Sequence, residues 1–227
     1  MWPYILLAFI IIFTYLFFNS PKGKGIVGEY RVKKILKRCA LEVGGIELSN
    51  FMFKDDKSSS QIDNMLLTQK ALYVIEVKNY NGYIFGNEES NEWTVTVKHT
   101  NKKRSKSGRV YHKVNITKHK FYNPIKQNKT HINKIKNLTN ILDLVPVYNI
   151  VLFGKNAVIK DVSHSGNSFV LHQRELKKFI SKNERLIEVE LSNENQIEII
   201  ESLFEINIKD KKLRKEHVTN IKKKYDK

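Results

Sequence analysis

Three charged side chains beside apolar segments have the types and spacing that metal-assisted hydrolysis needs. Glu76 and Lys78 end the apolar run that starts at Leu72, and Asp63 lies near the start of the preceding apolar segment, residues 62–67. β-Branched and aromatic residues predict two strands here, joined by a short turn into a hairpin. Because side chains alternate along a strand, Glu76 and Lys78 share one face, and Asp63 on the partner strand can face them.

Two carboxylates at that separation suit a hard divalent cation such as Mg²⁺, which takes oxygen ligands and keeps waters that can become nucleophiles. Lys78 can orient such a water, help to deprotonate it, or stabilise the negative charge that develops on a phosphate in transfer. In the alternative interpretation, Asp63 marks a strand end, and Glu76 and Lys78 form an ion pair on a solvated face. The pattern alone leaves both interpretations open.

Several separated blocks within residues 25–140 resemble one family in content and order. The Asp, the hairpin and the Glu-x-Lys are similar to the PD-(D/E)xK nuclease superfamily, and the longer match is to its nuclease-related domain family, NERD. The blocks are Gly28-Glu29, Gln61-Ile62-Asp63, residues 73–82, Trp93, and Asn123-Pro124 with Gln127 and His131. The chain departs from the family pattern at Asn64, where a histidine is common, and at Ala71, where a glycine usually makes the turn.

The resemblance implies an α/β fold with a restriction-endonuclease-like core, in the order αβββαβ, whose mixed central sheet is flanked by helices. It implies a metal-dependent nuclease in which Asp63 and Glu76 hold Mg²⁺ (or Mn²⁺) and the Val77 carbonyl is a third ligand. Lys78 would position the attacking water. No small-molecule cofactor is expected.

Two further polar residues are implied as supports of this catalytic site. A helix is predicted to start near Gly28, after a flexible link at residues 22–25, so that Glu29 lies in its first turn, where a negative charge suits the helix dipole. A second helix is predicted to start at Asn123-Pro124, and Gln127 lies beside its buried stripe. The resemblance implies that Glu29 and Gln127 reach the active site.

The charge balance favours an anionic partner, either nucleic acid or an acidic membrane surface. The chain has 40 Lys and Arg against 23 Asp and Glu, a formal net charge of +17. Residues 98–136 hold 13 of the basic and none of the acidic side chains, with aromatic residues interleaved, which suits a phosphate backbone with some base stacking. A solvated hairpin tip is the alternative for residues 102–109. We expect nucleic acid, with DNA ahead of RNA, and the binding residues are predicted to be Lys102, Lys103, Arg104, Lys106, Arg109, Lys113, Lys118 and Lys120.

The N-terminal segment is apolar enough to cross a membrane. No charged side chain occurs from Trp2 to Pro21, and residues 2–18 would span about 26 Å as a helix, close to the roughly 30 Å hydrocarbon core. A cleaved signal peptide and a buried core helix are the two alternatives. A signal peptide would usually show a basic start and small residues before its cleavage site, and this segment shows neither. Since Lys22 and Lys24 follow the segment, the positive-inside tendency predicts a single-pass anchor in the cell membrane with the C-terminal body in the cytoplasm.

The chain is therefore predicted to comprise a transmembrane anchor (1–21), a NERD nuclease-like core (22–145), a C-terminal completion of the α/β domain (146–208) and a basic tail (209–227). The leading hypothesis is a membrane-anchored, metal-dependent nuclease acting on DNA or RNA. The alternatives are a non-cleaving nucleic-acid-binding module tethered to the membrane, and a scaffold that binds anionic lipid. The oligomeric state is not predicted.

Overall fold

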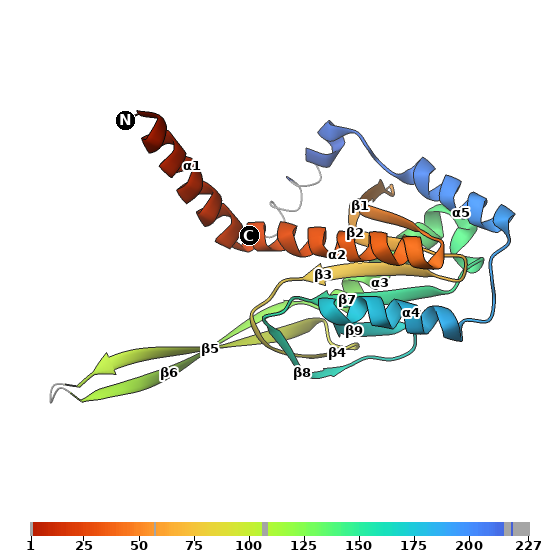
Figure 1. The fold of residues 1–227 in the computed structure, drawn as a ribbon. Helices are drawn as coiled ribbons and strands as arrows, with labels where there is room; N and C mark the ends of the chain where they lie inside the picture. Colours follow the sequence, from red (N-terminus) through yellow and green to blue (C-terminus); the bar gives the residue numbers. More distant parts are fainter. Residues whose placement is uncertain (1, 57, 106–108, 216–218, 220–227) are drawn as a thin grey trace.

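A five-stranded mixed sheet with the order β1-β2-β3-β7-β9 runs through the body of the protein (Figure 1). The computed structural model describes residues 2–56, 58–105, 109–215 and 219. The first three strands pair antiparallel, and the last two run parallel to β3. Their bounds are β1 (Ile46–Lys54), β2 (Ser59–Leu67), β3 (Leu72–Lys78), β7 (Val147–Phe153) and β9 (Ser168–His172).

Helices cover both faces of this sheet, and each face has its own apolar cluster. On one face, α2 (Pro21–Val43) and α4 (Leu176–Leu186) pack on Tyr73, Ile75 and Ile150. On the other face, α3 (Pro124–Leu138), the 3-10 helix η1 (Asn140–Asp143) and α5 (Asn193–Ile206) cover Leu72 and Val74. A further 3-10 helix, η2 (Gln173–Glu175), precedes α4. The order α2-β1-β2-β3-α3-β7 confirms the predicted αβββαβ core and a mixed α/β architecture consistent with the restriction-endonuclease-like fold.

A second sheet, with the order β6-β5-β4-β8, is inserted mainly between β3 and α3. It contains β4 (Gly82–Asn87), β5 (Glu92–Arg104), β6 (Val110–Tyr122) and β8 (Ala157–Ser163). Trp93 and Ile84 from this sheet pack against Val151 and Phe153 of β7 in a third apolar cluster. Beyond this cluster, β5 and β6 continue as a two-stranded ribbon that projects away from the body (Figure 1).

The helix α2 begins earlier than the sequence predicted. Ser20 is its N-cap and accepts a hydrogen bond from the Gly23 N–H, and Pro21 occupies the first turn, where a missing N–H is tolerated. Residues 22–25 are therefore helical, and the predicted flexible link is wrong. Glu29 lies in the third turn, so the interpretation of its charge as a partner of the helix dipole is also wrong.

The apolar helix α1 (Trp2–Asn19) lies outside the body of the fold (Figure 1). None of its residues is buried, and among the described residues it is the one helix long and apolar enough to cross a membrane by length and composition. A signal sequence near an N-terminus has the same properties. Gly23 allows α1 to pack closely on the start of α2, since a Cβ there would lie 2.1 Å from the Phe17 carbonyl oxygen.

Candidate active site

Asp63 lies just beyond the point where β2 and β3 cease to pair. The ladder between these strands ends at Asn64↔Ile75, and the Asp63 Oδ2 accepts a hydrogen bond from the Val77 N–H at 2.8 Å. On the other side of β2 lies β1, in which Asn50 has a φ of 53°. The pairing of β1 with β2 passes from Ser49↔Asn64 to Phe51↔Ile62 and leaves out Asn50 and Asp63. This irregularity in β1 faces Asp63, so the carboxylate lies at a break in the strand pairing.

Glu76, Lys78 and Gln127 form a continuous polar chain across the face of β3 that α3 covers. The Lys78 Nζ donates to the Glu76 Oε1 at 2.6 Å and to the Gln127 Oε1 at 2.9 Å. The Glu76 side chain is 4% exposed, so this ion pair is largely removed from water. The structure therefore brings the predicted Glu76, Lys78 and Gln127 into direct contact.

A buried asparagine network fixes α3 on the sheet and hence fixes Gln127. The Asn123 Oδ1 accepts from the Ile125 and Lys126 N–H groups, and its Nδ2 donates to three backbone carbonyls in residues 87–90. One turn further along, the Asn128 Nδ2 donates to the Val74 carbonyl of β3. Since Gln127 lies between these two anchored asparagines, its amide is held at the end of β3.

Three carboxyl groups influence one another electrostatically at this site. Burial and the nearby charges of Glu76 and Glu29 raise the pKa of Asp63 well above its ordinary value, although the Val77 N–H and Lys78 oppose the rise. Burial, followed by the charge of Glu76, also raises the pKa of Glu29. Glu29 thus reaches the site from α2, whereas the other two carboxylates come from β2 and β3.

Lys78 carries the positive charge of this cluster. Burial alone would lower the pKa of its ammonium group, but the charge of Glu76 and the hydrogen bond to it, together with the charge of Asp63, raise this pKa above its ordinary value. Lys78 therefore stays protonated at neutral pH and acts as a hydrogen-bond donor and a cation. The possibility that it deprotonates a water as a neutral amine is disfavoured.

The donor set is compatible with Mg²⁺ or Mn²⁺. In the described part of the chain, no group of three or more His, Cys, Asp or Glu side chains is close enough to hold a metal ion. Mg²⁺ is commonly bound by one or two carboxylates, with waters and substrate oxygens completing its octahedron. Asp63 and Glu76 provide two such carboxylates. The rise in the pKa of Asp63 reflects its burial first and then the repulsion by Glu76 and Glu29, and a divalent cation would relieve that repulsion.

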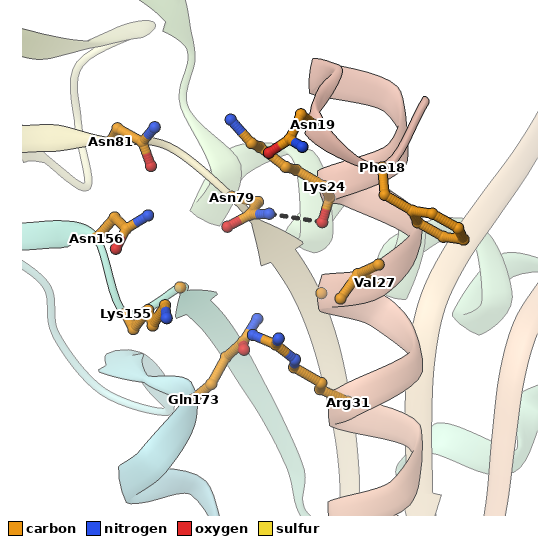
Figure 2. Close-up of a pocket in the computed structure, with 12 residues that line it drawn as sticks. Phe18, Asn19, Lys24, Val27, Arg31, Asn79, Asn81, Lys155, Asn156 and Gln173 are labelled. Carbon is orange, nitrogen blue, oxygen red and sulfur yellow. Dashed lines mark hydrogen bonds between the residues drawn. The ribbon is translucent and has the colours of Figure 1, made fainter. Parts of the chain in front are cut away.

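A cleft of about 370 Å³ lies between α2 and the segments that follow β3 and β7, and basic and amide side chains line much of it. Figure 2 shows Lys24 and Arg31 on α2 facing Lys155 and Gln173 across it. The Gln173 amide nitrogen is buried and has no hydrogen-bond partner among the described residues. Asn79, which directly follows Lys78, also lines the cleft and donates to the Lys24 carbonyl. The cleft thus offers cationic and amide N–H groups to an anion.

The predicted nucleic-acid-binding residues belong to the second sheet. Within the described part of the chain, they are exposed and lie on the ribbon or at its tip. Lys102, Lys103 and Arg104 are in β5, Lys113, Lys118 and Lys120 are in β6, Arg109 is in the connecting turn, and Lys106 lies outside the described residues. The base of the ribbon contacts the segment after β3 through Tyr80 and Phe121, whose ring centroids are 4.4 Å apart.

Sequence reasoning missed a second buried polar cluster, centred on Glu88. Its carboxylate accepts hydrogen bonds from Lys129 on α3 and from the hydroxyls of Ser165 and Ser168. Burial opposes the ionisation of Glu88, but these hydrogen bonds outweigh it and lower the pKa of the carboxyl to about 2. No sequence pattern indicates this cluster, because its members are distant in the chain and have no characteristic spacing. It ties the second sheet to α3.

Comparisons with known proteins identify the family of the chain. Residues 24–154 match the family model of the nuclease-related domain, NERD. The chain is also similar to an uncharacterized protein of Bacillus anthracis, pXO1-01, with 29% identity over 210 residues that cover 92% of this chain and 89% of the relative. No solved structure matches significantly. The matched segment spans more than half of the chain and contains Asp63, Glu76, Lys78, Glu29 and Gln127, so the protein belongs to the nuclease-related domain family.

Proposed function

We propose that this protein is a nuclease that hydrolyses phosphodiester bonds with the help of Mg²⁺ or Mn²⁺. The family assigns a nuclease-related character, and the observation that supports the finer proposal is the meeting of Asp63, Glu76 and Lys78 at the end of β3. Gln127 and Glu29 lie beside them. This combination has one buried and one partly buried carboxylate, one protonated lysine and an amide, which are the groups that phosphodiester hydrolysis uses.

Each side chain has a role that follows from its contacts. A bound divalent cation would supply Lewis acidity and an activated water. Asp63 and Glu76 would hold that cation, with the Val77 carbonyl as a third ligand, and the Val77 N–H keeps the Asp63 carboxylate oriented. Lys78 would orient the attacking water and stabilise the charge on the phosphoryl oxygens, while Gln127 restrains its ammonium group. Glu29 adds negative charge that favours the cation.

The substrate is nucleic acid, with DNA ahead of RNA. Phosphates are attracted by the positive charge of the ribbon and by the adjoining cleft, whose lining residues include Lys24, Arg31 and Lys155 and no Asp or Glu. Asn79 lines the cleft and directly follows Lys78, so the cleft adjoins the end of β3. We expect Arg31→Gln to weaken substrate binding and leave the rate of the bound complex nearly unchanged.

The helix α1 is a single-pass membrane anchor that leaves the body in the cytoplasm. Its 18 residues have a mean hydropathy of 1.8 and no buried member, and Lys22 and Lys24 follow it directly. The full chain should resist alkaline extraction from membranes, and protease added outside intact cells should leave the body uncut. Release by alkaline extraction, or digestion of the body from outside, would contradict this topology.

Cleavage in the presence and absence of metal tests the proposed function. The full chain in detergent micelles is incubated with single- and double-stranded DNA and RNA, each with Mg²⁺, Mn²⁺ or EDTA. We expect cleavage of at least one DNA substrate with either metal and none with EDTA. Binding without any cleavage would instead support the second candidate, a non-cleaving module that tethers nucleic acid at the membrane.

A further inference from the structure

The β5–β6 ribbon has two chemically different faces. Residues directly opposite each other in an antiparallel pair lie on the same face. At the base of the ribbon, the face that contains Trp93 and Val95 is buried against the body. We call its continuation the inner face and the opposite side the outer face. The outer face carries the basic residues Lys98, Lys102, Arg104, Lys118 and Lys120, whereas the inner face carries Lys103 and Lys113.

The outer face is suited to a polyanion and poorly suited to insertion into a lipid bilayer. No Asp or Glu occurs within residues 93–122, and the acidic residue at the base, Glu92, pairs with Lys120. Val114 and Ile116 are 47% and 63% exposed on the same face as the lysines. Elements that insert at a membrane surface separate an apolar face from a charged one, and this ribbon has no such apolar face.

The dimensions of the ribbon match the major groove of B-form DNA. Beyond the body, residues 98–104 of β5 and 110–116 of β6 pair without further support, a length of about 23 Å. Two strands with their side chains are roughly 10 Å wide, and the major groove is about 12 Å wide and admits a two-stranded ribbon. The lysines can reach flanking phosphates, while Val114 and Ile116 can contact thymine methyl groups. The major groove of double-stranded RNA is too narrow for this.

The ribbon is attached to the body beside the candidate active site. Phe121 at its base packs on Tyr80, and Tyr80 follows Lys78 by two residues. Trp93, opposite Phe121 in the ladder, stacks on Phe153 of β7. The ribbon therefore starts next to the end of β3, the strand that carries Glu76 and Lys78.

We propose that the outer face of the β5–β6 ribbon, which starts beside the candidate active site, binds in the major groove of double-stranded DNA. The inference rests on the proposed function only for the choice of nucleic acid as the partner, and it requires no cleavage. It defines the substrate class more narrowly, as duplex DNA.

Binding measured without metal tests the inference. The full chain in neutral detergent micelles with EDTA is titrated into a short labelled DNA duplex, and fluorescence anisotropy reports binding at several salt concentrations. The outer-face variant is Lys102→Gln/Lys118→Gln, and the matched control is the inner-face variant Lys103→Gln/Lys113→Gln, which removes the same charge from the same two strands. The sequence predicted Lys103 and Lys113 as binding residues, but the inference assigns them to the face that does not enter the groove. We expect the outer-face variant to weaken binding at least about 10-fold and to reduce the salt slope by about 1.8, and the control to weaken binding less than about 3-fold.

Different nucleic acids and lipids in the same assay distinguish binding in the major groove from binding to any anionic surface. We expect tighter binding to the DNA duplex than to an RNA duplex of the same sequence or to either single strand. We also expect that pyrimidines with bulky C5 substituents, which fill the major groove, weaken binding. Equal weakening by the two variants, or equal affinity for duplex DNA and duplex RNA, would overturn the inference. So would loss of DNA binding when phosphatidylglycerol, but not phosphatidylcholine, is added to the micelles, because the outer face would then bind anionic lipid.

The nuclease proposal and the ribbon proposal can each be contradicted while the other stands. A chain that binds duplex DNA through the outer face but cuts no substrate with metal would contradict the nuclease and leave the ribbon's role intact. A chain that cuts with metal while the outer-face variant binds duplex DNA normally would contradict the role of the ribbon alone.

Discussion

The Asp63 carboxylate accepts a hydrogen bond from the backbone N–H of Val77 at 2.8 Å, although the two residues lie on different strands and beyond the last pair of the β2–β3 ladder. This contact turns Asp63 toward the segment that carries Glu76 and Lys78. It also gives a partner to the Val77 N–H, which has no backbone partner on β2 because the β2–β3 ladder ends before it. A buried carboxylate is thereby held close to a second one, at a cost in stability that a bound cation would offset.

Asp63→Asn should make the metal-free protein more stable. The amide oxygen of Asn can still accept from the Val77 N–H, while the buried charge beside Glu76 and Glu29 disappears. We expect the free energy of unfolding to rise by about 1 kcal/mol in EDTA, as found when functional groups are neutralised at strained sites. Urea unfolding measures this, and Mg²⁺ should stabilise the wild type but not the variant. A variant that is less stable in EDTA, or equally stabilised by Mg²⁺, would refute this view of Asp63.

Glu29→Gln should reduce cleavage without altering the fold. The carboxyl of Glu29 interacts electrostatically with Glu76 and Lys78, so its neutralisation weakens the attraction of the site for a cation. We expect about a 10-fold lower rate at limiting Mg²⁺, partly restored at high Mg²⁺. The matched control is Glu42→Gln on the same helix, since Glu42 is an exposed residue paired with Lys177. Equal rates for the two variants would remove Glu29 from the site.

Asn123→Ala should destabilise the protein and disturb Gln127. The variant loses the cap of α3 and leaves three backbone carbonyls of residues 87–90 without their donor. We expect a loss of about 2 kcal/mol or more in the free energy of unfolding. Asn115→Ala, on an exposed part of the ribbon, is the control and should change stability by less than about 0.5 kcal/mol. Similar losses for both would show that the Asn123 network is unimportant.

The Glu88 cluster should make stability fall in acid. The folded-state pKa of Glu88 is about 2, below its ordinary value of 4.5, so the folded state favours the ionised carboxyl. This contribution is fully present above pH 4.5 and is lost as the pH falls from 4.5 toward 2. Glu88→Gln should cost about 2 kcal/mol at neutral pH and flatten the pH dependence in that window. Urea unfolding at several pH values measures both, and an unchanged acid slope in the variant would contradict the assignment.

Much of the core was predictable because its signals are local. The apolar runs before Leu67 and Val77 gave the hairpin, and Asn123-Pro124 gave the start of α3. The start of α2 was missed because two glycines looked like a link, whereas Ser20 and Pro21 begin the helix before them. The strand β6 was missed because its exposed half is polar and basic, with no buried face to impose an alternating pattern.

The candidate site was only partly predictable for a related reason. The prediction that Glu29 and Gln127 reach the site came from the family resemblance, since both are far in the sequence from Glu76 and Lys78. The hydrogen bond between Lys78 and Gln127, the turn of Asp63 onto the Val77 N–H and the Glu88 cluster depend on how separate elements pack. Neither spacing nor composition records such packing.

The measurement that tests the central claim most directly is single-turnover cleavage of duplex DNA by the full chain and by Asp63→Asn and Lys78→Met, with Mg²⁺ and with EDTA. Melting temperatures confirm that each variant is folded, and Glu42→Gln is the control. We predict cleavage by the wild type and the control with Mg²⁺ alone, and a loss of at least about 100-fold in both site variants. Cleavage by folded Asp63→Asn or Lys78→Met at the wild-type rate, or cleavage in EDTA, would contradict a metal-dependent site at the end of β3.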